Sequence, residues 1–237
     1  MGLTESVLGL IADKPAGAVS VGARYTAVRV GDRVGVARTM YVDSQEVLDV
    51  NELANRKLAH LILSDNPTEA SIGAAAINAQ TVPGGNLSSG NIFKKIIQMS
   101  GSFESIGVVG WFPFVRHLEG TVHVFEKSPR EGCLPASEAE AILPGCDLVV
   151  ITGSAFVNKT LERLLQISNG HTLVIGPSTP LSPVLFEFGA DMLAGIISNA
   201  DHIMEIVGHD GGTKDFIGFA DSVIMEPDQS AAMIDGR

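Results

Sequence analysis

The sequence predicts an α/β protein in which a small ββαα domain precedes a doubly wound parallel sheet. Before Gly101, two strand-like segments are followed by two helix-start signals. After Gly101, short apolar segments alternate with helical stretches, a pattern typical of parallel strands covered by helices on both faces. We place the domain boundary after residue 88, so that residues 1–88 and 89–237 form the two domains, and we expect them to meet at the carboxyl edge of the sheet.

The first strand is expected over residues 19–27, where apolar and polar side chains alternate. The alternation slips at Val28, so the strand is either bulged there or covered on both faces. A turn at Gly31-Asp32-Arg33 then leads into a second strand over residues 34–40.

Two helices are expected next in the N-terminal domain. The first follows Asn51 and has apolar residues at helical spacing, namely Ala54, Leu58, Leu61 and Ile62. The second begins with Asn66 as its cap, Pro67 in its first turn and Glu69 three residues after the cap. Residues 81–91 are rich in Gly, Ser and Asn and are expected to be a linker, from which a short helix begins at Ile92.

Five apolar segments of the second domain predict its parallel strands, at residues 105–110, 121–126, 147–152, 171–176 and 191–198. Start signals for the intervening helices occur at Ser137, Ser154 and Ser182.

Composition excludes several classes of protein and partner. Apolar residues make up 45% of the chain and charged residues 18%, which excludes a disordered chain. The net charge of −11 argues against nucleic acid and anionic membranes as partners. We expect no signal peptide and no membrane span. Cys133 and Cys146 stand alone, so we expect a cytoplasmic protein without a disulfide framework or an intrinsic metal site.

Candidate ligand-binding residues follow the strands, because ligands of open parallel sheets bind beyond the carboxyl ends of the strands. The first strand ends in Gly110, Trp111 and Phe112 and lacks the GxGxxG of a standard NAD site. The two aromatic side chains either form a wall for a planar ligand or pack in the protein. Glu126 ends the second strand and is suited to accept hydrogen bonds from a diol, unless it is simply exposed.

The third and fourth strands end in hydroxyl-rich segments. Thr152, Gly153 and Ser154 open a helix that is expected to carry Asn158, which predicts an anion site unless Ser154 only caps the helix. Four further candidates follow the fourth strand, namely Gly176, Pro177, Ser178 and Thr179. Two more prolines come shortly after them in the sequence. Proline restricts this segment and leaves preorganised donors on its Ser and Thr residues.

Other catalytic and binding patterns are weaker. The histidines show neither HxH nor HxxxH, and no GxSxG nucleophile motif is present. Arg24 and Thr26 either cover the crevice from the N-terminal domain or belong to an exposed strand face. The sequence does not name a cofactor, and it leaves a homo-oligomer open.

Several of these segments together resemble a known family. The phrases Ser105-Ile-Gly-Val-Val-Gly-Trp-Phe-Pro, Asp147-Leu-Val-Val-Ile-Thr-Gly, Val157-Asn-Lys-Thr and Ile175-Gly-Pro-Ser-Thr-Pro resemble the family called the putative heavy-metal chelation domain. The segments Arg24-Tyr-Thr-Ala-Val and Gly73-Ala-Ala-Ala-Ile-Asn are similar to the companion domain that precedes it.

The resemblance implies a Rossmann-like domain after an enolase N-terminal-like ββαα domain, with the active site between them. It also implies a small-molecule-binding protein, an enzyme of flavin-, pterin- or siderophore-like chelator metabolism that is linked to metal acquisition. The alternative is a non-catalytic binding protein for a metal chelate or an adenosyl-type ligand. Direct metal binding would require several convergent His, Cys or carboxylate ligands.

Overall fold

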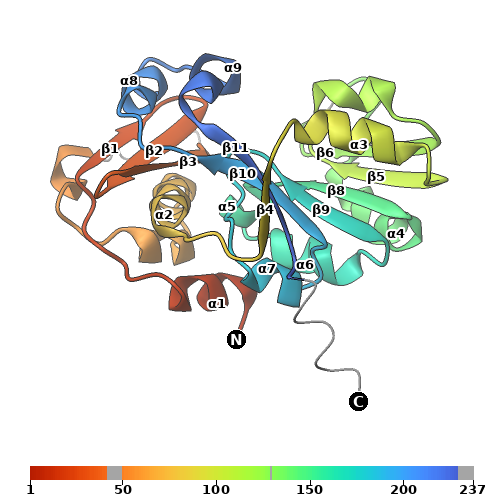
Figure 1. The fold of residues 1–237 in the computed structure, drawn as a ribbon, viewed down its shortest axis with the longest axis horizontal. Helices are drawn as coiled ribbons and strands as arrows, with labels where there is room; N and C mark the ends of the chain where they lie inside the picture. The colour runs from red at the N-terminus through yellow and green to blue at the C-terminus, as the bar shows by residue number, and fades with distance from the viewer. Residues whose placement is uncertain (42–49, 129, 229–237) are drawn as a thin grey trace.

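Two β-sheets organise the chain in the computed structural model, which describes residues 1–41, 50–128 and 130–228 (Figure 1). The smaller sheet is antiparallel and has the order β1-β2-β3. Its strands are β1 (Ala18–Val21), β2 (Tyr25–Val30) and β3 (Arg33–Arg38). The helix α1 (Leu3–Gly9) precedes it, and η1 (Val50–Leu53), η2 (Ala59–Leu63) and α2 (Pro67–Gln80) follow it.

The prediction of one strand over residues 19–27 was wrong, because the chain turns at residues 22–24 and forms the antiparallel pair β1 and β2. The alternation slips at Val28 because the strand is covered on both faces, which was the second of the two expected causes. Helix α2 packs on one face of β2, and α8 (His202–Gly208) packs on the other (Figure 1). Val28 is therefore fully buried even though it breaks the alternation.

The two helices predicted after Asn51 have different outcomes. The first is replaced by the short 3-10 segments η1 and η2, and Asn55 between them has a left-handed backbone with φ of +63°. The second forms as predicted. The Asn66 side chain accepts hydrogen bonds from the N–H groups of Thr68 (2.9 Å) and Glu69 (3.1 Å), and Pro67 occupies the first turn of α2.

The larger sheet has eight strands in the order β4-β11-β10-β9-β8-β5-β6-β7. The five predicted strands are present as β5 (Ser105–Val109), β6 (Thr121–Glu126), β8 (Leu148–Thr152), β9 (His171–Ile175) and β10 (Met192–Ile197). Together with the short β7 (Leu134–Pro135) they are all parallel, and their spatial order in chain numbering is 3-2-1-4-5-6. This is the strand order of a Rossmann fold, which confirms the α/β fold class.

Two strands of the larger sheet were not predicted, and they join it through antiparallel pairing. The strands β4 (Asn86–Ser89) and β11 (Asp221–Glu226) pair with each other, and β11 pairs with β10. The expected linker at 81–91 therefore contains a strand of the larger sheet. The division after residue 88, which stays a prediction, falls inside this strand.

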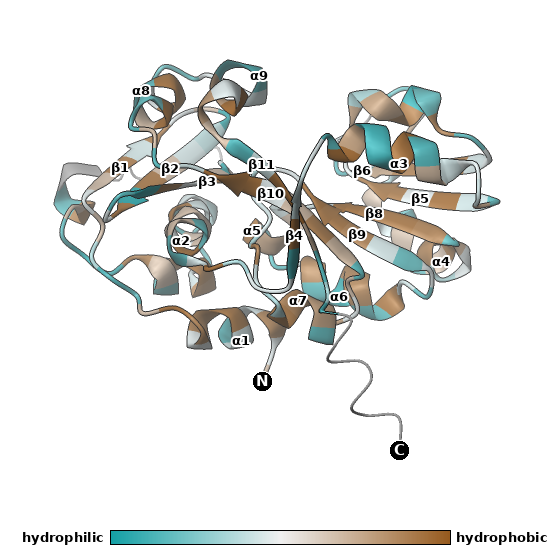
Figure 2. Cartoon of the chain, in the orientation of Figure 1, coloured by the Kyte–Doolittle hydropathy of each residue, from teal (hydrophilic) through white to brown (hydrophobic). Residues whose placement is uncertain are grey.

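Both faces of the larger sheet are covered by helices (Figure 1). The helix α3 (Ile92–Ser100) begins at Ile92 as expected, and it covers one face with η3 (Pro113–His117) over the buried residues Ile106, Val108, Leu148 and Val150. The second face is covered by α5 (Ser154–Val157), α6 (Leu161–Ile167) and α7 (Val184–Glu187). Its core continues into the N-terminal half, where it includes Val28 and Ile72, and the strands at this junction are hydrophobic (Figure 2).

The remaining helical segments are short. They are η4 (Ala136–Glu138), α4 (Ala139–Ile142), η5 (Leu143–Gly145), α9 (Thr213–Phe216) and η6 (Ile217–Phe219). Helices begin near the predicted starts, at Ser154 for α5 and just after Ser182 for α7, whereas Ser137 lies inside η4. None of the three serine side chains caps its helix. Within the described ranges, no helix is long and apolar enough to cross a bilayer.

The outer edge of β3 joins the two halves of the chain. The N–H of Val34 donates to the carbonyl of Ser198 (2.9 Å), and the N–H of Arg38 donates to the hydroxyl of Ser178 (2.8 Å). Between them, the carbonyl of Val36 accepts from the amide of Asn78 on α2 (2.8 Å). Since Ser178 follows β9 and Ser198 follows β10, the two halves meet at the carboxyl edge of the parallel strands, as expected.

We predict that Gly35→Ala destabilises the protein by roughly 1–3 kcal/mol, the usual cost of overpacking. Gly35 lies on β3, and a Cβ there would be 2.8 Å from the carbonyl carbon of Asn78 and would clash with the backbone of Ala75 and Ala79. Urea denaturation measures the free energy of unfolding. Gly9→Ala is the control, because a Cβ at Gly9 meets nothing within 4 Å. Equal stabilities of the two variants would contradict the close packing of β3 on α2.

Candidate functional site

The ends of β5, β6 and β8 come together at the point where the strand order of the larger sheet reverses. The N–H of Gly110 donates to the carbonyl of Phe125 (2.9 Å), and the N–H of Trp111 donates to Oε1 of Glu126 (2.7 Å). Gly110 has φ of +93°, and a Cβ there would lie 2.9 Å from Cγ2 of Thr152. The structure thus brings together Gly110, Trp111, Glu126 and Thr152, and the glycine is required by the close approach of Thr152.

The carboxylate of Glu126 is held by two backbone donors. Besides the bond from Trp111, Oε2 accepts from the N–H of Lys127 (3.2 Å). The side chain is only half-buried, and each carboxylate oxygen has a further lone pair. Glu126 is therefore oriented by the protein and able to accept hydrogen bonds from a ligand.

The two aromatic residues after β5 have different surroundings. Phe112 packs against Phe114 and Phe93, with ring centroids 5.3 and 5.9 Å apart, so its place is explained by packing. Trp111 is half-buried, and the guanidinium carbon of Arg130 lies 3.6 Å from its ring centroid. This cation–π contact places a positive charge over the ring of Trp111, whose N–H group binds Glu126. Sequence reasoning missed Arg130, although it follows Glu126 by only four positions.

Thr152 and Ser154 present a pair of hydroxyl groups at the end of β8. Their oxygens are 2.9 Å apart, and both side chains are half-buried. Gly153 between them is buried, and a Cβ there would lie 2.5 Å from the backbone nitrogen of Thr179. Gly153 is thus required by the packing of the loop after β9.

The prediction that the helix beginning at Ser154 carries Asn158 was wrong. Helix α5 has only four residues, and Lys159, whose φ is +63°, interrupts the helical backbone before α6 begins. Oδ1 of Asn158 accepts from the N–H (3.2 Å) and the hydroxyl (2.6 Å) of Thr160. Nζ of Lys159 donates to the carbonyl of Leu63 (3.2 Å) and to that of Ser64. Asn158 therefore has a local structural role, and its part in ligand binding stays a prediction.

The loop after β9 lies deeper, beneath β3. Gly176, with φ of +114°, and Pro177 are half-buried, whereas Ser178 and Thr179 are each only 3% exposed. The hydroxyl of Ser178 accepts a hydrogen bond from the N–H of Arg38. The hydroxyls of Thr179 and Ser182 and Oδ1 of Asn78 are buried without a hydrogen-bond partner among the described residues. Such groups are usually satisfied by ordered water or by a ligand.

The two candidates from the N-terminal half, Arg24 and Thr26, lie in different surroundings. Thr26 is buried and its hydroxyl is 2.9 Å from that of Thr39, so it does not face the crevice. Arg24 is exposed at the turn between β1 and β2, where it lines a hollow of about 550 Å³ beside α8 and α9. A second hollow, of about 210 Å³, lies between α1 and α6. Sequence reasoning missed both hollows, because each is formed by segments far apart in the chain.

A directly bound metal does not fit the part of the chain that the structure describes. No group of three or more His, Cys, Asp or Glu side chains is arranged there to hold a metal ion. A metal would need such convergent ligands.

We predict that Ser178→Ala destabilises the protein by about 1–3 kcal/mol, because it leaves the N–H of Arg38 without its acceptor. Chemical denaturation measures the loss. Ser88→Ala, on the exposed strand β4, is the control and should change the free energy of unfolding by less than about 0.5 kcal/mol. An unchanged stability of the Ser178 variant would show that the junction does not depend on this hydrogen bond.

Known proteins share both halves of this chain. Two family models, DUF364 and DUF4213, match residues 96–226 and 5–81, and both are described as putative heavy-metal chelation. The chain is 30% identical over 138 residues to the uncharacterized protein MJ0500 of Methanocaldococcus jannaschii, and the match spans 53% of each chain.

Solved structures show the same architecture. A protein of unknown function from the DUF364 family of Desulfitobacterium hafniense superposes with a TM-score of 0.81 at 29% identity, covering 94% of this chain and 97% of that one. A DUF364 protein of Pyrococcus horikoshii, 23% identical, shares the fold with a TM-score of 0.75 over 94% and 98% of the two chains. The resemblance found in the sequence is confirmed: the chain belongs to the family described as putative heavy-metal chelation.

Proposed function

We propose that the chain binds a small polar ring compound of the metal-chelator type at the ends of β5, β6 and β8. The observation that carries the proposal is the oriented carboxylate of Glu126 at the reversal point of a Rossmann strand order. The family description supports a link to metals, and the absence of a metal-ligand cluster among the described residues favours a chelator over a bare ion.

The chemistry of the site favours a vicinal diol or a catechol. In Rossmann folds, a carboxylate at the end of the second strand accepts hydrogen bonds from ribose hydroxyls. Glu126 ends β6, which is the second parallel strand in chain order and pairs with β5. The hydroxyls of Thr152, at the end of β8, and of Ser154, at the start of α5, supply further donors and acceptors on the other side of β5.

The charges favour a neutral or singly anionic ligand. Arg130 is the one positive group that contacts Trp111 in the described structure, and the net charge of the chain is −11. A triphosphate would require clustered Lys or Arg side chains or a P-loop, and the sequence has no P-loop. A single acidic group on a ring is compatible with Arg130.

A non-catalytic carrier of a metal chelate is the second candidate beside an enzyme of chelator metabolism. Within the described residues, no hydrogen bond joins Glu126 to another titratable side chain, and its hydrogen-bond partners are the backbone N–H groups of Trp111 and Lys127. This arrangement suits ligand binding more directly than proton transfer. Chromatography of the ligand after incubation with the protein separates the two candidates, because only an enzyme changes it.

We predict that Glu126→Gln weakens the binding of 2,3-dihydroxybenzoate or adenosine by about tenfold or more, since the amide removes a charged acceptor from the diol. Isothermal titration calorimetry measures the affinity. Benzoate and 2′,3′-dideoxyadenosine, which lack the diol, should bind the wild-type protein more weakly than their parent compounds.

Glu119→Gln provides the matched control, because this exposed glutamate precedes β6 at its opposite end. It should bind both diols as tightly as the wild-type protein. Equal affinities of the Glu126 and Glu119 variants would place the site elsewhere, and equal binding of the analogues without a diol would exclude this ligand class.

A further inference from the structure

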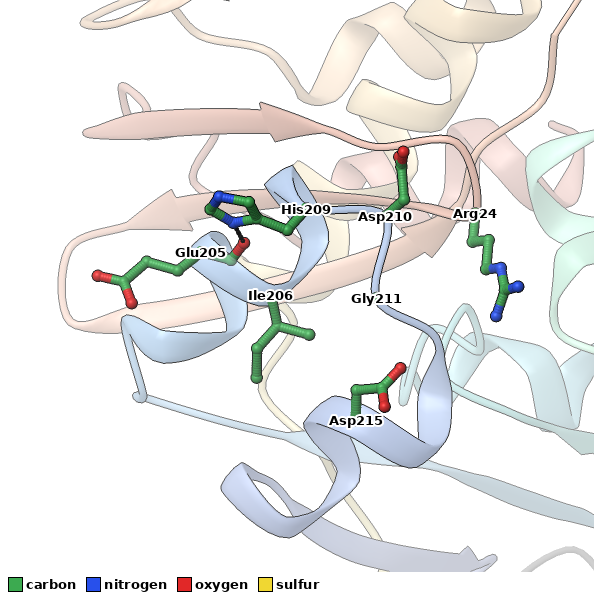
Figure 3. A pocket seen from close by; sticks show the side chains of 7 residues that line it. All are labelled: Arg24, Glu205, Ile206, His209, Asp210, Gly211 and Asp215. Carbon is green, nitrogen blue, oxygen red and sulfur yellow. Dashed lines mark hydrogen bonds between the residues drawn. The ribbon is translucent and has the colours of Figure 1, made fainter.

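The hollow that Arg24 lines is separate from the ends of β5, β6 and β8. It lies where the turn between β1 and β2 meets α8, α9 and the loop between these helices (Figure 3). Helices α8 and α9 stand over the smaller sheet, at the opposite end of the molecule from α3 and β6 (Figure 1). The hollow therefore lies at a second contact between the N-terminal and C-terminal halves, apart from the contact made by β3.

The walls of this hollow are fixed by contacts between the two halves. The carboxylate of Asp210 accepts a hydrogen bond from the N–H of Ala23, and the hydroxyl of Tyr25 is 2.8 Å from that of Thr213. Gly22 packs against α8 so closely that a Cβ there would lie 3.1 Å from the carbonyl carbon of Val207 and would clash with its oxygen. The hollow is thus preorganised, although its rim is open.

Arg24 is the positive group of the hollow and has a free guanidinium. The guanidinium forms no hydrogen bond or ion pair with any part of the chain that the structure describes, and Figure 3 shows the Arg24 side chain extending along one side of the hollow. A guanidinium has donors in a fixed fork that matches a carboxylate. Arg24 is therefore suited to bind an anionic group of a ligand.

The other charged groups of the hollow are negative. They are Glu205 on α8, Asp210 in the loop and Asp215 on α9. Asp215 uses one oxygen for the N–H of Gly212 (2.8 Å), whereas the carboxylate of Glu205 has no partner among the described residues. Arg24 and these three carboxylates together contribute a net charge of −2, which attracts a cation.

Two further observations describe this electrostatic environment. Nδ1 of His209 donates to the carbonyl of Glu205 (2.8 Å), which holds the ring against α8. The pKa of Tyr41, whose hydroxyl donates to the carbonyl of Gly22, is raised first by burial and second by the negative charge of Asp210. The negative charge of Asp210 favours a ligand that brings positive charge.

We propose that this hollow binds a small zwitterion that carries one carboxylate and at least one ammonium group, with a basic amino acid as the best match. Arg24 holds the carboxylate, and Glu205 and Asp215 hold the ammonium groups. A bare metal ion does not fit, because the described carboxylates do not form a group of three ligands. The volume of about 550 Å³ is ample for a molecule of this size.

Calorimetric titration with L-lysine and with cadaverine, which is lysine without its carboxylate, tests the proposal. We expect lysine to bind the wild-type protein more tightly than cadaverine. Arg24→Gln should weaken lysine about tenfold and leave cadaverine unweakened, whereas Glu205→Gln should weaken both. Arg116→Gln, at an exposed arginine of η3, is the matched control and should bind as the wild-type protein does.

The proposal is overturned if lysine does not bind at millimolar concentration, if cadaverine binds as tightly as lysine, or if Arg24→Gln leaves lysine binding unchanged. Glu126→Gln separates this site from the one proposed above. It should bind lysine as the wild-type protein does, and a loss of lysine binding in that variant would show that the two sites are not independent.

Discussion

The outer edge of β3 has to find hydrogen-bond partners, because the strand is buried and a sheet neighbour satisfies only its inner edge. No fourth strand of the smaller sheet pairs with this edge among the described residues. Asn78 on α2 satisfies the carbonyl of Val36, and the loops after β9 and β10 supply Ser178 and Ser198 for the N–H groups on either side. This requirement seats the small sheet on the carboxyl edge of the large one.

The position of β3 decides which strand ends a ligand can reach. Strand β3 covers the loop after β9, so Ser178 and Thr179 of this loop are buried. The ends of β5, β6 and β8 lie beside this cover, where Trp111, Glu126 and Thr152 stay half-buried. The separate, acidic hollow lies at a second contact between the halves, where the turn between β1 and β2 meets α8 and α9.

The sequence predicted what local pattern determines. Apolar runs gave the five parallel strands, and the Asn66-Pro67 pair gave the start of α2. The hairpin of β1 and β2 was missed because residues 22–24 do not interrupt the alternation, and β4 because an exposed edge strand is polar. Residues at strand ends were predicted as candidates, but the use of Ser178 by β3 and the break at Lys159 depend on distant contacts that no local pattern records.

The central claim is that a diol ligand binds at the half-buried ends of β5, β6 and β8, beside the cover that β3 provides. Amide ¹H–¹⁵N spectra recorded during titration with 2,3-dihydroxybenzoate test it most directly, because Trp111 and Lys127 donate their N–H groups to Glu126. The account predicts that these two amides shift with the ligand while the amide of Arg38, bonded to Ser178, stays unchanged. Shifts confined to α8 and α9, with Trp111 and Lys127 unaffected, would contradict it.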